Sequence, residues 1–299
     1  MENNLDTKKI SYIDNDPQLF LETNSSFKKL VNIFLIPILN NLPKNFKKVI
    51  KKTNKAAGEV IDNATNHQAL EVLYNKGVAL SKKRIMKTIF QSIWFNLDNS
   101  KAVRNRLKFV RRELTNQLKL ISTYDREINI ISIATGSSRA IIETINSEQI
   151  FREMKVSITF LDKNEHAITY SKKMSQAINC PNIRFEWIND TVGNFFKNKQ
   201  QKKYDIVEIV GLLDYFTDAK VTETFKNIHN ILEEGGIVIT ANINHNREEK
   251  FVTNVIDWPM IYRSADELGV LLNAAGFKYN NMNIFYEPLR IHGLIKAKK

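Results

Sequence analysis

The chain contains little cysteine, proline or glycine, and it has no long hydrophobic run. Its 299 residues include 1 cysteine, 6 prolines and 10 glycines. The single cysteine, Cys180, excludes an internal disulfide and a cysteine-based metal site, and no group of histidine, cysteine and carboxylate residues has metal-ligand spacing. The most apolar early stretch, residues 30–42, is shorter than the roughly 20 residues that span a bilayer. Residues 1–16 are polar and unlike a signal peptide, so we expect a cytoplasmic protein.

Positive charge is abundant but unevenly distributed. The formal net charge of +12 belongs entirely to residues 1–120, because basic and acidic residues balance over residues 121–299. A basic region can attract nucleic acid, an anionic membrane surface or an acidic partner, and the alternative interpretation is a lysine-rich solvated surface. The asymmetry predicts two regions with different roles.

The spacing of apolar residues divides the chain into three predicted regions. Residues 1–22 form a flexible tail. Residues 23–120 form a basic helical domain, since apolar residues recur there every three or four positions. From residue 121 to residue 299, short β-rich runs alternate with helical stretches, which predicts parallel strands joined by crossover helices. The predicted strands cover residues 128–133, 156–161, 183–188, 204–210 and 236–242.

The C-terminal part of the chain adds three expectations. Gly235 and Gly236 are predicted to end the last crossover helix. Ser264 and Glu267 have the spacing of a capping box at the start of the next helix. Only a turn around Pro288 separates the last two apolar runs, which is too short for a parallel crossover and therefore predicts an antiparallel hairpin at one sheet edge. The predicted fold is α/β: a mostly parallel, Rossmann-like sheet with an antiparallel C-terminal hairpin, preceded by an all-α region.

Small or polar residues follow four successive predicted strands. Ligands of doubly wound sheets bind beyond the carboxyl ends of the strands, so these residues predict a site for a cofactor that contains a nucleoside. The order is a small-residue loop, an acid, a second acid and an apolar wall. The candidate cofactor-binding residues are Ala134, Thr135, Gly136, Ser137, Arg139, Asp162, Lys163, Asn189, Asp190, Thr191, Val210, Gly211 and Leu212.

The loop after the first strand favours S-adenosylmethionine as that cofactor. Loops that hold the pyrophosphate of a dinucleotide usually carry three glycines, whereas this loop has only Gly136, and no Gly-Lys-Ser/Thr sequence suits ATP. S-adenosylmethionine has no pyrophosphate, so one close backbone approach is sufficient. Asp162 follows at about the spacing of an acid that holds ribose hydroxyls. Taken alone, Asp162 is better explained as a helix N-cap, and only the order of the four segments favours the ribose role.

Three segments carry a resemblance to a known family. IISIATGSSRAIIE, YDIVEIVGLLDYF and IDWPMIYRSADEL follow one another as in bacterial class I S-adenosylmethionine-dependent methyltransferases. They resemble the subgroup named for biosynthesis of the extracellular factor 3-hydroxypalmitate methyl ester. Its members share Ala-x-Gly-x-x-Arg, Gly-Leu-x-Asp-Tyr and Asp-Trp-x-x-x-Tyr-Arg motifs. The resemblance covers roughly residues 100–295 and implies O-methylation of a small molecule or of a lipid carboxylate.

Three residues are candidates for catalysis. Arg263 is expected to orient an acceptor carboxylate, because guanidinium binds carboxylates bidentately, and Tyr215 to line the acceptor pocket. His245, just after the fifth strand, is the candidate general base if the acceptor is a hydroxyl. The alternatives are a structural ion pair of Arg263 with Asp257 or Asp266, and a solvated His245.

Two other functions stay open at this stage. Residues 44–55 and 103–114 are basic enough to supply the phosphate contacts of a nucleic-acid methyltransferase. The absence of an Asn/Asp-Pro-Pro-Tyr/Phe motif after the fourth strand argues against methylation of base amino groups. A non-catalytic scaffold is the third possibility. In the leading interpretation, the N-terminal helices form a lid or a substrate cavity, and residues 30–42 meet an anionic membrane. The oligomeric state is left open.

Overall fold

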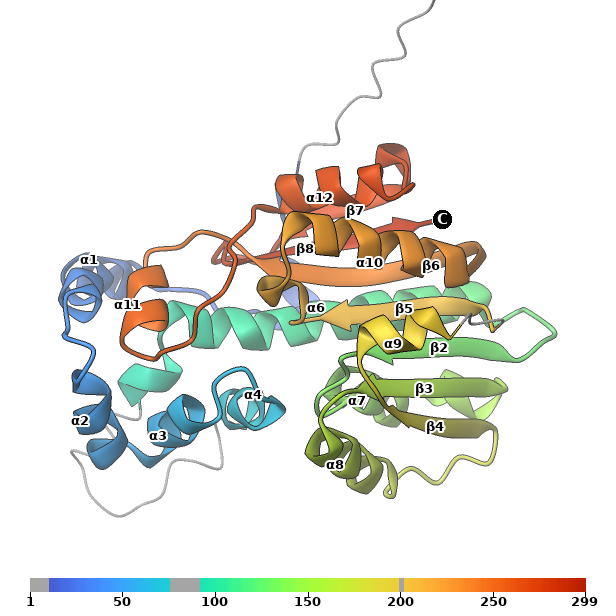
Figure 1. Cartoon of the computed structure of the whole chain (residues 1–299), viewed down its shortest axis with the longest axis horizontal. Coiled ribbons are helices and arrows are strands. Elements are labelled where there is room, and N and C mark those ends of the chain that lie inside the picture. The colour runs from blue at the N-terminus through green and yellow to red at the C-terminus, as the bar shows by residue number, and fades with distance from the viewer. Residues whose placement is uncertain (1–10, 76–91, 199–201) are drawn as a thin grey trace, which may run out of the picture.

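The computed structural model describes residues 11–75, 92–198 and 202–299. Eight strands form one sheet in the order β1-β7-β8-β6-β5-β2-β3-β4 (Figure 1). The strands are β1 (Tyr12–Ile13), β2 (Ile128–Ile133), β3 (Val156–Asp162), β4 (Ile183–Asn189), β5 (Tyr204–Val210), β6 (Leu232–Ile243), β7 (Met282–Tyr286) and β8 (His292–Lys298).

Strand directions confirm the predicted fold class. The pairs of β3 with β4, β2 with β3, β2 with β5 and β5 with β6 are all parallel. Strand β8 is antiparallel to both of its neighbours, β6 and β7. The predicted hairpin is therefore present, with β8 on the inner side and β7 further out. The expected capping box also exists, since Ser264 and Glu267 exchange hydrogen bonds at the start of α12.

Helices cover both faces of the sheet. One core contains side chains of α6, α7 and α8, and the other contains side chains of α9, α10 and α12. A third core joins α3 and α4 to α11, which follows β6. The helices are α1 (Ser26–Asn40), α2 (Phe46–Thr53), α3 (Lys55–Asp62), α4 (His67–Tyr74), α6 (Asp98–Ile121), α7 (Arg139–Ser147), α8 (Glu165–Ser175), α9 (Val192–Lys197), α10 (Asp218–Ile231), α11 (Glu249–Asn254) and α12 (Ala265–Ala274).

Packing does not follow the boundary expected at residues 120 and 121. Helix α6 lies against the sheet, where Phe109 and Leu114 are almost fully buried. The buried carboxylate of Glu248 caps the first turn of α6, because it accepts hydrogen bonds from the backbone N–H groups of Asp98 and Asn99, both at 2.9 Å. The small helices α2, α3 and α4 instead form a layer beside the carboxyl ends of the strands (Figure 1). Residues 76–91, expected to be helical, lie outside the described residues.

The prediction of a flexible tail is wrong for residues 12–22. Strand β1 pairs in parallel with β7 and forms the edge of the sheet. Glu22 forms an ion pair with the buried Arg104 of α6, and Asp14 forms one with Arg112 at 2.8 Å. The polar composition of residues 12–22 suggested a tail. Their ion-pair partners are in α6, far away in the sequence, so composition alone could not reveal them.

Gly235 and Gly236 do not end the crossover helix, so that prediction is also wrong. Helix α10 ends at Ile231, and both glycines lie within β6. Gly235 has a left-handed φ of +80°, and a Cβ on Gly236 would lie 3.0 Å from the carbonyl oxygen of Tyr204. The glycines allow β6 to approach β5 closely where their register shifts.

Candidate active site

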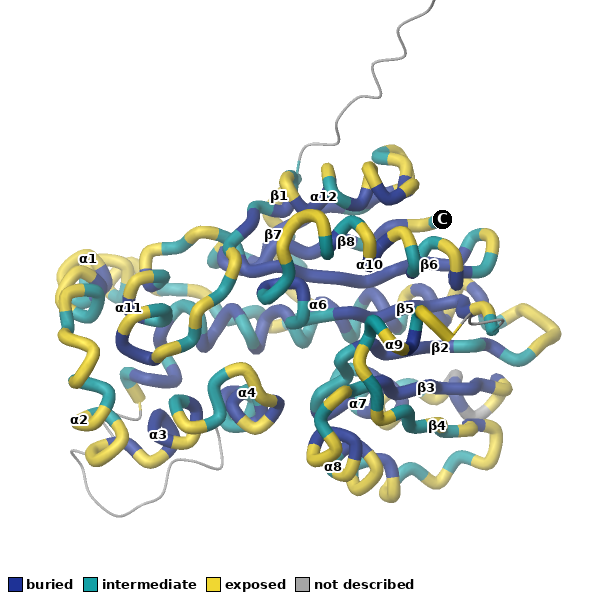
Figure 2. The backbone as a smooth tube through the Cα atoms, viewed as in Figure 1, coloured by how far each residue is buried: buried dark blue, intermediate teal, exposed yellow. Residues whose placement is uncertain are grey.

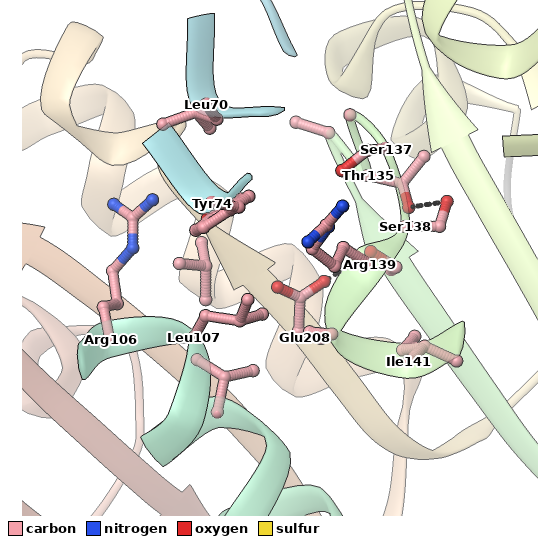
Figure 3. A pocket seen from close by; sticks show the side chains of 16 residues that line it. Leu70, Tyr74, Arg106, Leu107, Thr135, Ser137, Ser138, Arg139, Ile141 and Glu208 are labelled. Atoms are coloured by element: carbon pink, nitrogen blue, oxygen red, sulfur yellow. Dashed lines mark hydrogen bonds between the residues drawn. The ribbon is translucent and has the colours of Figure 1, made fainter. Parts of the chain in front are cut away.

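A pocket lies where the strand order reverses, beyond the carboxyl ends of β2 and β5. This is the position at which open α/β sheets bind ligands. The space measures about 530 Å³, counting its open side. Figure 3 shows Leu70 and Tyr74 of α4 on one side and the loop after β2 on the other. We call it the loop pocket; it is lined by Leu70, Tyr74, Arg106, Leu107, Val110, Ser132, Ala134, Thr135, Gly136, Ser137, Ser138, Arg139, Ala140, Ile141, Glu208 and Val210.

The loop after β2 has an unusual backbone. Ala134, Gly136 and Ser138 have φ values of 54°, 56° and 58°, all in the left-handed region. Such a conformation costs a residue other than glycine about 1–3 kcal/mol and is concentrated at ligand sites. Hydrogen bonds hold the shape, since the Thr135 N–H donates to the Leu161 carbonyl at 3.0 Å and the Ser138 N–H to the Thr135 carbonyl at 2.8 Å. The loop is therefore pre-shaped, and its sequence-predicted residues line one pocket.

Asp162 is attached to this loop from the end of β3. One carboxylate oxygen accepts from the Gly136 N–H at 2.9 Å, and the other accepts from the Asn164 N–H at 2.8 Å. The N-cap of α8 is Asn164, so the alternative of Asp162 as the N-cap is wrong. Each oxygen keeps a lone pair for a further donor, which is compatible with a hydroxyl-bearing ligand.

The predicted residues after β4 lie next to Asp162. The Asn189 amide donates to the Asp162 carbonyl at 3.0 Å. Asp190 accepts from the Thr191 N–H at 2.7 Å, and the Thr191 hydroxyl caps α9. Lys163 is exposed beside them. The structure thus brings Asp162, Asn189 and Asp190 together at adjacent strand ends, outside the lining of the loop pocket.

Glu208 of β5 is a buried carboxyl group in the loop pocket that the sequence did not single out. It is 8% exposed and accepts a hydrogen bond from the Ser132 hydroxyl. Burial raises the pKa of Glu208 to about 7, although Ser132 and the positive charge of Arg106 oppose the shift. The group therefore titrates close to neutral pH, where it changes the charge of the pocket.

This pKa predicts a pH dependence of stability. A pKa raised above the ordinary 4.5 contributes stability that is complete below pH 4.5 and is lost as the pH rises through about 7. We expect the free energy of unfolding of the wild type, relative to Glu208→Gln, to fall between about pH 5 and 7 by up to about 1.4 kcal/mol per pH unit. Urea unfolding of both proteins at several pH values measures it, and a difference that is independent of pH would contradict the assignment.

A largely buried ion pair connects helix α4 to the residues that follow the loop after β2. Arg139 donates from Nε and Nη2 to the two carboxylate oxygens of Glu71 at 3.1 and 2.9 Å. The same carboxylate accepts from the Tyr170 hydroxyl of α8 at 2.9 Å. His67 lies directly over the loop, since a Cβ on Gly136 would be 3.4 Å from its own Cβ. Arg139 therefore contacts the N-terminal helices, and α4 covers the loop pocket.

A second pocket of about 610 Å³ lies between the N-terminal helices and α11. It shares Leu70 and Arg106 with the loop pocket, so the two spaces meet at these side chains. Most of its walls are apolar, and we call it the apolar pocket; it is lined by Val60, Leu70, Leu73, Trp94, Leu97, Asn99, Ser100, Val103, Arg106, Ile243, Glu248, Phe251, Val252, Ile256, Trp258, Met260 and His292.

Two buried polar side chains in the apolar pocket were missed by the sequence analysis. His292 is 2% exposed, and neither ring nitrogen has a hydrogen-bond partner among the described residues. Burial, with a contribution from Arg106, lowers the pKa of His292 well below 6.5, so the imidazole is neutral. Arg106 is 4% exposed and is hydrogen-bonded to Tyr74. A neutral imidazole and a guanidinium thus lie in one apolar space.

The structure does not bring Arg263 to either pocket. The side chain is 4% exposed, and its N–H groups donate to the Asp218 carboxylate, the Asn242 amide oxygen and two backbone carbonyls. Its ion-pair partner is Asp218, rather than Asp257 or Asp266. Arg263 therefore connects β6 to the segment after β5. Its guanidinium is not placed to orient the carboxylate of an acceptor.

Tyr215 and His245 also lie outside the linings of both pockets. The Tyr215 hydroxyl accepts from the Trp258 indole N–H at 2.6 Å, and burial raises the pKa of Tyr215 to about 12. The His245 ring is stacked on Tyr262 and hydrogen-bonded to Glu249 at 2.9 Å, with 68% of its side chain exposed. The position of His245 fits the solvated-loop alternative. Of the two, only Tyr215 contacts a lining residue of the apolar pocket, which is Trp258.

The arginines of α6 are engaged within the protein. Arg104 pairs with Glu22, Arg111 with Glu143 at 2.8 Å, and Arg112 with acidic residues of the N-terminal segment and of α6. Arg106 is buried between the pockets. These arginines belong to residues 103–114, one of the two stretches considered for phosphate contacts, and each of them contacts other side chains of the protein.

Comparisons with known proteins agree with this arrangement. Residues 59–287 match a family described as "Putative methyltransferase", whereas no curated protein matches the chain. A solved structure of a possible exported protein from Bordetella parapertussis is 17% identical over 79% of this chain and 80% of its own, with a TM-score of 0.64. The DszA carbon methyltransferase is 13% identical over 91% of this chain and 70% of its own, with a TM-score of 0.55. At these identities, the likeness concerns the fold.

Proposed function

Because the chain belongs to this methyltransferase family, we propose that it transfers the methyl group of S-adenosylmethionine to an oxygen atom of an apolar small molecule or lipid. One observation carries the proposal. The pre-shaped loop pocket and the apolar pocket meet at Leu70 and Arg106. A cofactor in the first and an acceptor in the second would have their reacting groups next to each other, and alignment is the main contribution that an enzyme makes to this displacement.

The residues around the loop pocket fit S-adenosylmethionine. The left-handed backbone of residues 134–138 leaves room for a ligand to approach the main chain. Asp162 has acceptor capacity for ribose hydroxyls, and Asn189 and Asp190 lie beyond it, on the side that would hold the adenine. Val210, the last residue of β5, lines the loop pocket. Gly211 and Leu212 follow it in the chain. When bound, the cofactor supplies a methyl group that its sulfonium has already activated.

The apolar pocket supports a hydroxyl acceptor. Its neutral, unpartnered His292 would accept the hydrogen bond of a hydroxyl group and take up the proton as the new O–C bond forms. Arg106 would stabilise the negative charge that develops on the oxygen. A carboxylate acceptor is already ionised and would need Arg106 but no base. A hydroxyl acceptor would therefore require His292, whereas a carboxylate acceptor would not.

We expect Asp162→Ala to weaken binding of S-adenosylhomocysteine at least tenfold, about 1.4 kcal/mol, because a charge-assisted hydrogen bond to the ribose would be lost. Isothermal calorimetry measures the affinity. Glu165→Ala is the matched control, since Glu165 is an exposed acid at the start of α8. Unchanged affinity in Asp162→Ala would reject the ribose contact. Absence of binding to the folded wild type would reject the cofactor and favour a non-catalytic scaffold.

A further inference from the structure

Helix α1 exposes five large apolar side chains, whereas the residues that it buries are Asn32 and Ile36. Asn32 is 5% exposed, and its amide donates to the Asp98 carboxylate at 3.1 Å. Asn40 donates to the Arg247 carbonyl at 2.8 Å. The outer face is largely exposed (Figure 2). Its large side chains are apolar, with exposed fractions from 49% to 75%: Phe27, Leu30, Ile33, Phe34 and Ile38.

These five side chains form one stripe along the helix, because they recur every three or four residues. The usual surface helix keeps its apolar residues against the core, whereas α1 buries Ile36 and carries this stripe on its exposed side as well. Other exposed large apolar residues of the described chain are distributed over several elements. A continuous exposed stripe of this kind marks a surface that binds another apolar surface.

The charge around α1 indicates what that surface is. The sequence from residue 24 to residue 58 contains no aspartate or glutamate. It holds eight lysines: Lys28, Lys29, Lys44, Lys47, Lys48, Lys51, Lys52 and Lys55. Three of them form ion pairs with acids outside this stretch: Lys47, Lys51 and Lys55. Two copies of the chain facing each other here would bring like charges together, which disfavours a dimer through this face. An apolar stripe beside lysines matches the two layers of an anionic membrane surface.

We propose that α1 binds in the plane of an anionic lipid membrane, with its apolar stripe in the acyl boundary and the neighbouring lysines at the headgroups. The helix has 15 residues, fewer than the roughly 20 needed to span a bilayer. In the part of the chain that the structure describes, no helix is long and apolar enough to cross a membrane. The chain would therefore lie on the lipid surface through α1.

The position of α1 connects this surface to the apolar pocket. The amide oxygen of Asn40 accepts from the backbone N–H of Phe251 at 3.0 Å, and Phe251 lines that pocket. Figure 1 shows α1 and α11 side by side. Membrane binding through α1 thus brings the apolar pocket close to lipid. The delivery of a lipid acceptor to this pocket rests on the proposed function, whereas membrane binding itself does not.

Vesicle flotation of the full chain tests the proposal without any methyl acceptor. We expect binding to phosphatidylcholine vesicles that contain phosphatidylglycerol, and at least tenfold weaker binding to pure phosphatidylcholine, because each lysine near an anionic surface adds attraction. Phe27→Ser combined with Phe34→Ser should weaken binding to the anionic vesicles at least tenfold. Val270→Ser, at an exposed apolar position of α12, should leave binding unchanged. Thermal unfolding confirms that the variants remain folded.

Other outcomes overturn the proposal. The proposal is rejected if the wild type does not bind the anionic vesicles. It is also rejected if Val270→Ser loses as much binding as the double variant. A dimer in light scattering that dissociates in the double variant, without vesicle binding, would identify a second copy as the partner of α1. Calorimetry with S-adenosylhomocysteine is independent of all these results, so loss of the membrane surface and loss of the cofactor site remain distinguishable.

Discussion

Replacing His292 by alanine is expected to lower the kcat of methyl transfer by roughly 10²- to 10⁴-fold, the usual contribution of a general base. The Kd of S-adenosylhomocysteine should not change, because His292 lines the apolar pocket and is absent from the lining of the loop pocket. The buried imidazole has no hydrogen-bond partner among the described residues, so its removal breaks none of the hydrogen bonds seen there. Single-turnover assays with candidate hydroxyl compounds, and calorimetry for the cofactor product, measure the two quantities.

A glutamine variant separates a base from a merely structural histidine. Since the pKa of His292 is lowered well below 6.5, its neutral form persists as the pH falls from 8 to 6.5, and a change of wild-type kcat over that interval is expected only from Glu208, whose pKa is about 7. The other charged groups of the pocket are Arg106 and Glu248. Burial raises the pKa of Glu248. His292→Gln keeps a polar group but cannot accept a proton into a ring, so it should be as slow as the alanine variant.

His229→Ala is the matched control. Burial also lowers the pKa of His229, yet this residue belongs to α10 and is absent from both pocket linings. We expect its kcat to lie within a factor of about two of the wild type. A large effect in His245→Ala and a small one in His292→Ala would restore the base expected from the sequence. Wild-type kcat in His292→Ala would instead favour a carboxylate acceptor held by Arg106.

The grouping of small and acidic residues at the carboxyl ends of the strands could be predicted from the sequence because it depends on local order. Strands β2 and β5 coincide with the runs predicted at residues 128–133 and 204–210. In a parallel sheet, whatever follows each strand lies at one edge, so Gly136 and Asp162 were expected to meet, and they are hydrogen-bonded. The small-residue loop was predicted because it follows a strand directly. The left-handed backbone of Ala134 and Ser138 could not be predicted from their residue types.

The lining of the apolar pocket could not be predicted because its residues meet only through tertiary packing. Arg106 is one of several arginines in α6, and nothing in the local pattern distinguishes it from those that form ion pairs. His292 begins β8, where the alternating hairpin pattern gives no indication of a pocket. Arg263 looked free because its partner, Asp218, is distant in sequence, whereas acids close in sequence suggested other pairs. Side-chain partners of this kind depend on which helices cover the strand ends.

The same limitation applies to α4, whose helix was predicted but whose position over the loop was not. Removing Glu71 tests that position, and we expect Glu71→Ala to lower the free energy of unfolding by about 1–3 kcal/mol, the usual cost of leaving buried donors without their acceptor; Arg139 keeps its ion pair with Glu143 at 3.3 Å. Glu71 accepts from Arg139, Tyr170 and Asn75, so three donors lose their acceptor at once. Urea unfolding followed by circular dichroism measures the loss.

Removal of Glu71 should also weaken cofactor binding. Leu70 and Tyr74 of α4 line the loop pocket, and α4 is held there by Glu71. Glu59→Ala is the matched control, because the ion pair of Glu59 with Lys55 on α3 is exposed and should contribute less than about 1 kcal/mol. The double variant Glu71→Ala with Arg139→Ala measures how much of the loss belongs to the pair of Glu71 with Arg139, since Arg139 also forms an ion pair with Glu143. If Glu71→Ala binds S-adenosylhomocysteine as tightly as the wild type, α4 does not form part of the cofactor site.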